Sequence, residues 1–110
     1  MTKYVISFPS GVMDVPDGEW QQVVDESHQV IRDIKAAGAY VFGGGINEEV
    51  EPVAVAADGA VSGPVYQPFD GGYTIIEVPT REAALHWAQR IAAACRCPQQ
   101  VQEFMYDPES

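Results

Sequence analysis

The chain has 110 residues, of which 46% are hydrophobic and 10% aromatic. This composition predicts one folded domain over residues 1–110 with a single apolar core, and it argues against disorder. Sixteen acidic and six basic residues give a formal net charge of −10, which disfavours nucleic acid and anionic membranes as partners because phosphates require a basic patch. The apolar runs are too short to span a membrane, and the N-terminus lacks signal-peptide features, so a cytoplasmic location is expected.

The first half of the chain shows one strand and one helix. Apolar and polar residues alternate over 3–8, which predicts a strand. After a turn-rich stretch, Asp17 stands where a helix N-cap is expected, and Ala37-Gly38 provides the C-terminal stop. Between them, apolar positions recur at spacings of three and four and form one helical stripe: Trp20, Val23, Val24, Ser27, Val30, Ile31 and Ile34.

The second half predicts a hairpin, two strands and another helix. From Ala39 onward we expect, in order, a strand at 39–45, a hairpin at 51–63 with Asp58-Gly59 as a two-residue turn, a strand at 73–78, a helix at 81–95 capped by Thr80, and a strand at 100–106.

This order of elements predicts a ferredoxin-like βαββαβ fold, class α+β, with an extra hairpin strand. Right-handed crossovers place both helices on one face of an antiparallel sheet and leave the other face bare. Either Tyr4, Ile6 and Phe8 or the residues between them would then form a large exposed apolar surface. We therefore expect a homodimer that buries this face.

No metal or cofactor site is predicted. Cys95 and Cys97 are too close in sequence for an unstrained disulfide and have no second ligand pair at zinc spacing, so reduced thiols are expected. Gly43-Gly44-Gly45 is not followed by the Lys-Ser/Thr of a phosphate-binding loop. The carboxylates at 47–51 lack the pattern of a calcium loop.

Several strings of the chain resemble the YCII-related family, in its DGPF (DGPFAETKE) branch. They are "IKAAGAYVFGGGI" at 34–46, "SGP" at 62–64, "GGYTIIEV" at 71–78 and "EAALHWAQRIAAA" at 82–94. The resemblance implies a dimeric α+β barrel with clefts between sheets and helices. Some relatives are small-molecule enzymes, one branch is similar to ring-fission-pathway dehydrochlorinases, and DGPF proteins often accompany sigma factors, which implies an accessory or regulatory role.

The chain departs from the family pattern at its signature loop. Ser62 stands where DGPF begins with aspartate, and Gln100 and Gln102 stand where many relatives carry Glu-x-Arg. His28 lies close to the histidine with which YCII enzymes are associated, but the matching aspartate is missing. The signature loop is thus degenerate, and the resemblance does not carry over an intact His–Asp pair.

His28 is the first candidate catalytic residue. It lies at the edge of the apolar stripe, where a general base would need a carboxylate to orient it. Asp70 in the loop and Glu77 on the following strand are the candidate partners. The alternative is a boundary histidine without function.

Ser62, Tyr66 and Phe69 are the candidate ligand-binding residues. They lie in the Pro- and Gly-rich loop before the strand at 73–78, and such loops often close over small organic ligands. The same aromatic residues are equally suited to packing on a dimer partner.

Three functions remain open on the sequence. A small-molecule-binding or accessory domain predicts an apolar pocket without a His–carboxylate pair. An enzyme with lyase- or hydrolase-like acid–base chemistry on a small aromatic or carbonyl substrate predicts His28 hydrogen-bonded to a carboxylate in a concave site. A domain that acts only on a protein partner predicts an exposed patch and no pocket.

Overall fold

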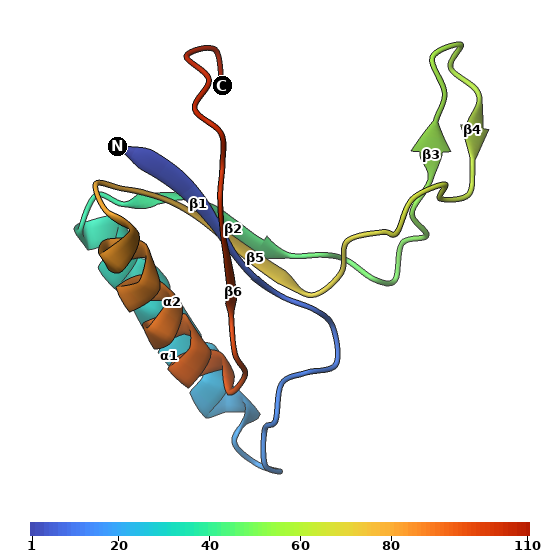
Figure 1. The fold of residues 1–110 in the computed structure, drawn as a ribbon. Helices are drawn as coiled ribbons and strands as arrows, with labels where there is room; N and C mark the ends of the chain where they lie inside the picture. Colours follow the sequence, from blue (N-terminus) through green and yellow to red (C-terminus); the bar gives the residue numbers. More distant parts are fainter.

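The chain has the ferredoxin-like βαββαβ arrangement in the computed structural model, which describes residues 1–110 (Figure 1). The elements are β1 (Thr2–Phe8), α1 (Trp20–Ala36), β2 (Tyr40–Gly45), β3 (Ala54–Val55), β4 (Val61–Ser62), β5 (Gly72–Val78), α2 (Arg81–Cys95) and β6 (Gln100–Glu103). The predicted α+β class and order of elements are confirmed. No helix combines the length and the apolar character that a membrane crossing requires.

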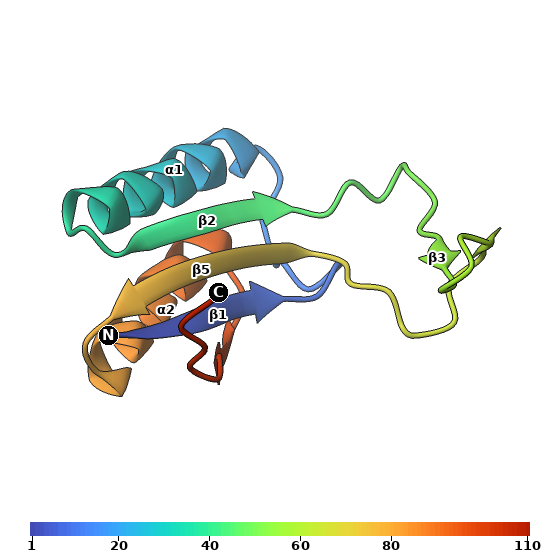
Figure 2. The same cartoon turned by 90° about the horizontal axis from the view of Figure 1, so that it is seen from above.

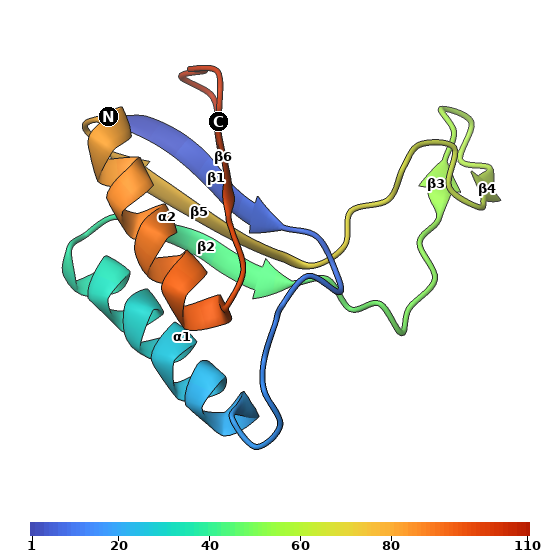
Figure 3. The same ribbon diagram turned by 60° about the horizontal axis from the view of Figure 1, so that its bottom comes forward.

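Four strands form one antiparallel sheet in the order β2-β5-β1-β6. This is the strand order of the split βαβ plan. Both helices cover the same face of the sheet, and the view from above shows the other face uncovered (Figures 2 and 3). The hairpin β3–β4 does not join this sheet but forms a separate two-stranded one.

The core lies between the sheet and the helices. Ile6 of β1, Ile34 of α1 and Ile76 of β5 are almost completely buried there, and each such burial contributes about 1.5–3 kcal/mol. The side of α2 that faces the sheet is built mainly from alanines, including Ala84 and Ala88, which lets this helix lie close to the sheet. Tyr4, Ile6 and Phe8, the alternating residues of β1, thus face the helices.

The opposite side of the sheet, which we call the open face, has no covering layer in a single chain. One row of paired residues crosses all four strands on this side, from Phe42 through Ile75 and Val5 to Gln102. Phe42 is 62% exposed. The bare apolar face that the sequence predicts is present. It is formed by the β1 residues that alternate with Tyr4, Ile6 and Phe8, together with their neighbours on β2 and β5.

Residues 46–70, which we call the arm, leave the end of the sheet and carry β3 and β4 at their far end (Figures 1 and 3). The accessible surface of the chain is 7705 Å², whereas a compact monomer of this mass exposes about 6,000 Å². The radius of gyration is 15.9 Å, against about 13 Å for a compact chain of this length. A single copy therefore exposes far more surface than a compact monomer does.

Two local predictions are corrected. Asp17 does not cap α1, because Gly18 adopts a left-handed φ of 84° and places Glu19 at the cap without a side-chain hydrogen bond. The hairpin turn has three residues rather than two, since Ala56 N–H donates to the carbonyl of Ala60. By contrast, the Thr80 cap is confirmed: its hydroxyl accepts a hydrogen bond from Ala83 N–H.

Two ion pairs join the helices and make stability depend on pH. Arg90 lowers the pKa of Asp33 below its ordinary value of 3.8, and Arg96 lowers that of Glu26 below 4.5. A carboxyl whose folded pKa is depressed stabilises the fold above its ordinary pKa and loses this contribution as pH falls through the folded pKa. We therefore expect the double variant Asp33→Asn/Glu26→Gln to melt below wild type at pH 7.

The same melting comparison at acid pH tests whether the charges of the two carboxylates cause this difference. Below about pH 4 the two pairs are progressively lost in wild type as well, so the melting temperatures of variant and wild type should converge. The control variant Glu109→Gln, in the exposed C-terminal tail, should follow wild type at both pH values. A difference that is constant with pH would show that the carboxylates act through packing rather than charge.

Candidate functional site

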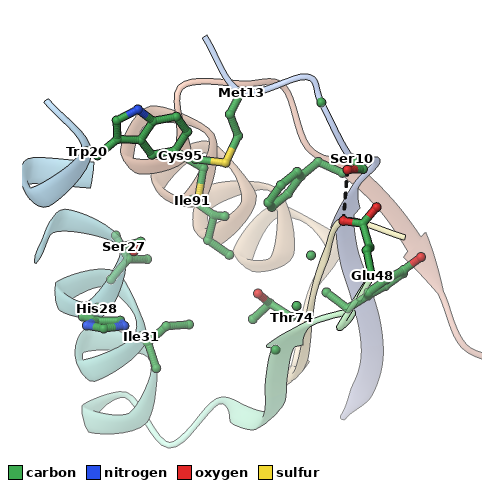
Figure 4. A pocket seen from close by; sticks show the side chains of 18 residues that line it. Ser10, Met13, Trp20, Ser27, His28, Ile31, Glu48, Thr74, Ile91 and Cys95 are labelled. Atoms are coloured by element: carbon green, nitrogen blue, oxygen red, sulfur yellow. Dashed lines mark hydrogen bonds between the residues drawn. The ribbon is translucent and has the colours of Figure 1, made fainter. Parts of the chain in front are cut away.

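A cavity of about 680 Å³ lies on the helix side of the sheet. One wall is α1, with Ser27, His28 and Ile31, and the other is formed by the ends of β2 and β5 (Figure 4). The end of α2 and the loop after β1 close it from above in this view, through Cys95 and Met13. We call this space the α1 cavity.

The wall beside β5 depends on Gly71-Gly72. Gly71 has a φ of 75°, and a Cβ atom there would lie 2.0 Å from the carbonyl oxygen of Phe8. A Cβ at Gly72 would lie 2.7 Å from the Phe8 ring. Only glycine allows the end of β1 to lie this close to β5, so these two residues let Phe8 line the cavity.

Ser10 fastens the loop after β1 to the base of the arm. Its backbone N–H donates to Asp70 Oδ1 at 3.2 Å, and its hydroxyl donates to Glu48 Oε2 at 3.0 Å. Figure 4 shows Ser10 and Glu48 together, on the side opposite α1. The two carboxylates therefore hold the loop over the cavity.

The lining is mainly apolar. Met13, Val30, Ile31 and Ile91 line it together with Trp20, whose side chain is 54% exposed at the N-terminal end of α1. Thr74 is the buried polar side chain of the lining. Such a surface, with few polar groups, is typical of a pocket for a small organic molecule.

The charge around the cavity is negative. Its lining contains no lysine or arginine and includes the carboxylate of Glu48, while the chain as a whole carries a formal charge of −10. Arg96 lies near the end of α2, but it donates to Glu26 Oε2 at 2.7 Å and is therefore neutralised locally. An anionic ligand would find no lysine or arginine in this lining.

Cys95 contributes a thiol to the cavity without nucleophilic character. Burial raises its pKa to about 11, and the neighbouring Cys97 adds to the shift. Because the thiolate is the reactive form, a thiol held neutral in this way acts as a small apolar group. Both cysteines are free thiols in the structure. No group of three or more His, Cys, Asp and Glu side chains is placed to hold a metal ion.

The structure places His28 on the cavity wall but pairs it with neither predicted carboxylate. Asp70 lies near the cavity, where it accepts the hydrogen bond from Ser10. Glu77 lies on the open face, on the other side of the sheet, and its nearest cation is Lys3 at 3.7 Å. The alternation of β5 causes this separation, because Thr74 and Ile76 face the helices whereas Glu77 faces away.

The three predicted ligand-binding residues lie on the arm rather than at the α1 cavity. Ser62 is in β4, and its hydroxyl donates to the carbonyl of its neighbour Gly63. Tyr66 is 87% and Phe69 77% exposed, and the Phe69 ring meets Tyr73 edge-on at 5.7 Å. Within one chain, the loop contributes only its end, at Gly71, to the cavity wall.

Sequence reasoning missed most of the lining. Thr74 could have been identified from the sequence, since it is the polar residue among the otherwise apolar residues of β5 that face the helices. Ser10 and Met13 could not, because they lie in a stretch without periodicity. The helical spacing of Trp20 favours a core or interface position, but this residue lies where α1 begins and lines the cavity mouth.

Comparison with known proteins gives a limited result. No family model matches the chain, and no curated protein sequence matches it. Among solved structures, the chain is similar to 5-chloro-2-hydroxyhydroquinone dehydrochlorinase (TftG) from Burkholderia phenoliruptrix AC1100, in complex with 2,5-dihydroxybenzoquinone, with 12% identity, 97% of each chain covered and a TM-score of 0.49.

Proposed function

We propose that the chain is a YCII-like domain that binds a small, mainly apolar molecule in the α1 cavity and acts as an accessory or regulatory protein. The observation that carries this proposal is the cavity itself. Its volume of about 680 Å³ falls within the range of about 300–1,000 Å³ that is common for small-ligand sites. Apolar walls and one buried hydroxyl, on Thr74, suit a ring with one polar substituent.

The proposed ligand is neutral or basic rather than acidic. A carboxylate in the cavity would lose part of its hydration without gaining a lysine or arginine partner, and it would be repelled by Glu48. A hydroxyl group would keep a hydrogen bond, for which Thr74 is the candidate. An amine would gain the attraction of Glu48.

We also propose that the protein is a cytoplasmic homodimer. The open face supports the dimer, because the apolar part of its row (Phe42, Ile75 and Val5) and the excess accessible surface exceed what monomers usually expose. Burial of this face against a second copy is the simplest way to remove it from water. Free thiols at Cys95 and Cys97 are compatible with a reducing compartment.

A series of three ligands tests the proposed site. We expect 2-naphthylmethanol and 2-naphthylmethylamine to bind wild type with dissociation constants on the order of 100 µM, measured by isothermal titration calorimetry. We expect 2-naphthoate, which has the same ring system, to bind at least about tenfold more weakly. Glu48→Gln should remove the advantage of the amine over the alcohol.

A blocked cavity provides the matched control. Ser27→Trp would place an indole inside the cavity, whereas Asp25→Trp adds the same side chain at an exposed position of the same helix that does not line it. The first variant should lose binding and the second should retain it. Binding that survives Ser27→Trp would place the ligand elsewhere, and no binding of any of the three compounds would contradict the proposed function.

The second candidate function is acid–base catalysis on a small aromatic or carbonyl substrate. The observation that favours it is the presence of His28 on the cavity wall. His28→Ala separates the two functions: a binding domain should keep its ligand affinity within a few-fold, whereas an enzyme should lose turnover of the bound compound. The absence of a carboxylate bonded to His28 makes binding the better supported function.

A further inference from the structure

Few contacts within its own chain hold the arm in place. At its base, Ile46 N–H donates to the carbonyl of Gly71, and Ser10 bonds Glu48 and Asp70. Beyond that point β3 and β4 pair with each other. The side chains that the arm leaves in water are large and apolar: Val53, Val55, Val61, Val65, Tyr66 and Phe69 are each at least 62% exposed.

Such a segment needs a surface to pack against. An isolated two-stranded hairpin is marginally stable at best in water, and here each strand has only two residues. The surface in excess of a compact monomer is roughly 1,700 Å² per chain, about twice the 800 Å² or so that each partner buries in a standard interface. A second copy of the chain therefore needs to cover more than a minimal patch.

The open face offers a receiving groove at the end of the sheet opposite the arm. This groove has a volume of about 780 Å³. Val41, Ile75, Phe104 and Met105 give it an apolar surface, and the C-terminal segment borders it. In Figure 1 the arm and the C-terminal segment both rise on the side of the sheet away from the helices.

Two-fold symmetry brings the two features together. Consider two copies whose open faces meet, related by a two-fold axis that lies between the faces and runs perpendicular to the strands. This axis places the end of one sheet that carries the arm over the end of the other sheet that carries the groove. The ten residues that follow Gly45, 46–55, extend up to about 33 Å, which exceeds the roughly 23 Å length of a seven-residue strand such as β5. The arm thus has the length to reach the groove of a second copy.

We propose that the arm of each copy packs into the open-face groove of a second copy. The valines of β3 and β4 then cover Ile75 and Phe104 of that copy, and both apolar surfaces are removed from water. This inference rests on the proposed homodimer and adds the segment that completes it. It also explains why the predicted loop residues Ser62, Tyr66 and Phe69 do not reach the cavity of their own chain.

Complementation between two defective chains tests this exchange. The arm variant is Val55→Glu/Val61→Glu, and the groove variant is Phe104→Glu. Each alone should dimerise at least about tenfold more weakly than wild type, measured by sedimentation velocity. Their equimolar mixture should form a heterodimer about tenfold tighter than either variant forms alone, because it retains one intact arm and one intact groove that face each other.

The control adds the same two charges to the arm without removing a large apolar side chain. Ala57→Glu/Gln67→Glu, at exposed positions, should dimerise like wild type. An arm variant that dimerises like wild type, or a mixture no tighter than its components, would overturn the exchange while leaving the homodimer intact. A wild type that remains monomeric at roughly 100 µM, far above the dissociation constants of stable dimers, would overturn both. A wild type that binds a different protein through the arm would overturn the exchange.

Discussion

Replacing Gly71 with alanine should lower the free energy of unfolding by about 2–5 kcal/mol. The new methyl group would lie 2.0 Å from the carbonyl oxygen of Phe8 and 2.7 Å from the carbonyl carbon of Pro9. Backbone atoms cannot move aside without separating β1 from β5. A left-handed φ of 75° adds its own strain for any residue with a Cβ. Urea denaturation at a fixed protein concentration measures the loss.

Gly38→Ala is the control that measures the backbone strain alone, so the difference between the two variants gives the steric part of the loss. Gly38 also has a left-handed φ, of 73°, but a Cβ atom at this position would meet no other atom within 4 Å. The substitution should therefore cost only about 1–2 kcal/mol. The Gly71 variant should also bind 2-naphthylmethanol more weakly, because it displaces the wall that carries Phe8. Equal losses of stability for the two variants would contradict the close packing of β1 against β5.

A charge at Ile75 should abolish the proposed homodimer. Ile75 lies at the centre of the open-face row, where it pairs with Val5 on one side and with Phe42 on the other. A glutamate buried between the two open faces would lose its hydration, and the lysine on this face, Lys3, is already paired with Glu77. We therefore expect Ile75→Glu to weaken dimerisation by a factor of about 100 or more. Sedimentation velocity over a range of concentrations measures this change.

The matched control for Ile75→Glu is Leu85→Glu. Leu85 is an aliphatic residue on α2 with 42% exposure, away from the open face. Its replacement should leave both the fold and the dimer unchanged. If Ile75→Glu dimerises like wild type, or if Leu85→Glu disrupts association equally, the open face is not the interface.

The elements of the fold were predictable because each carries a local pattern. Strand β1 alternates with a period of two, α1 has an apolar stripe, and Thr80 provides a capping hydroxyl for α2. The failure at Asp17 has a local cause as well, since Gly18 turns the chain before the helix begins. The spacing of Leu85 assigns it to the inner stripe of α2, but it is half exposed, because the alanines beside it make the closer approach to the sheet.

The site was less predictable, because it is formed by segments that have no pattern in common. His28 is identifiable from its position at the edge of a stripe. Its predicted partners failed for different reasons: Glu77 faces the other side of the sheet, and Asp70 is occupied by Ser10. The direction of the arm was not predictable either, since the hairpin pattern indicates that the chain reverses but gives neither the length of the turn nor the direction in which the arm leaves the sheet.

The central claim is that a small, mainly apolar molecule binds in the α1 cavity, and amide chemical shifts test it most directly. Uniformly ¹⁵N-labelled wild type is titrated with 2-naphthylmethanol, with Ser27→Trp titrated in parallel. We predict saturable shifts in residues 8–13, 27–31 and 71–74, the segments that line the cavity, and none in the blocked variant. Shifts confined to the arm or the open face, or no saturable shifts in wild type, would contradict it.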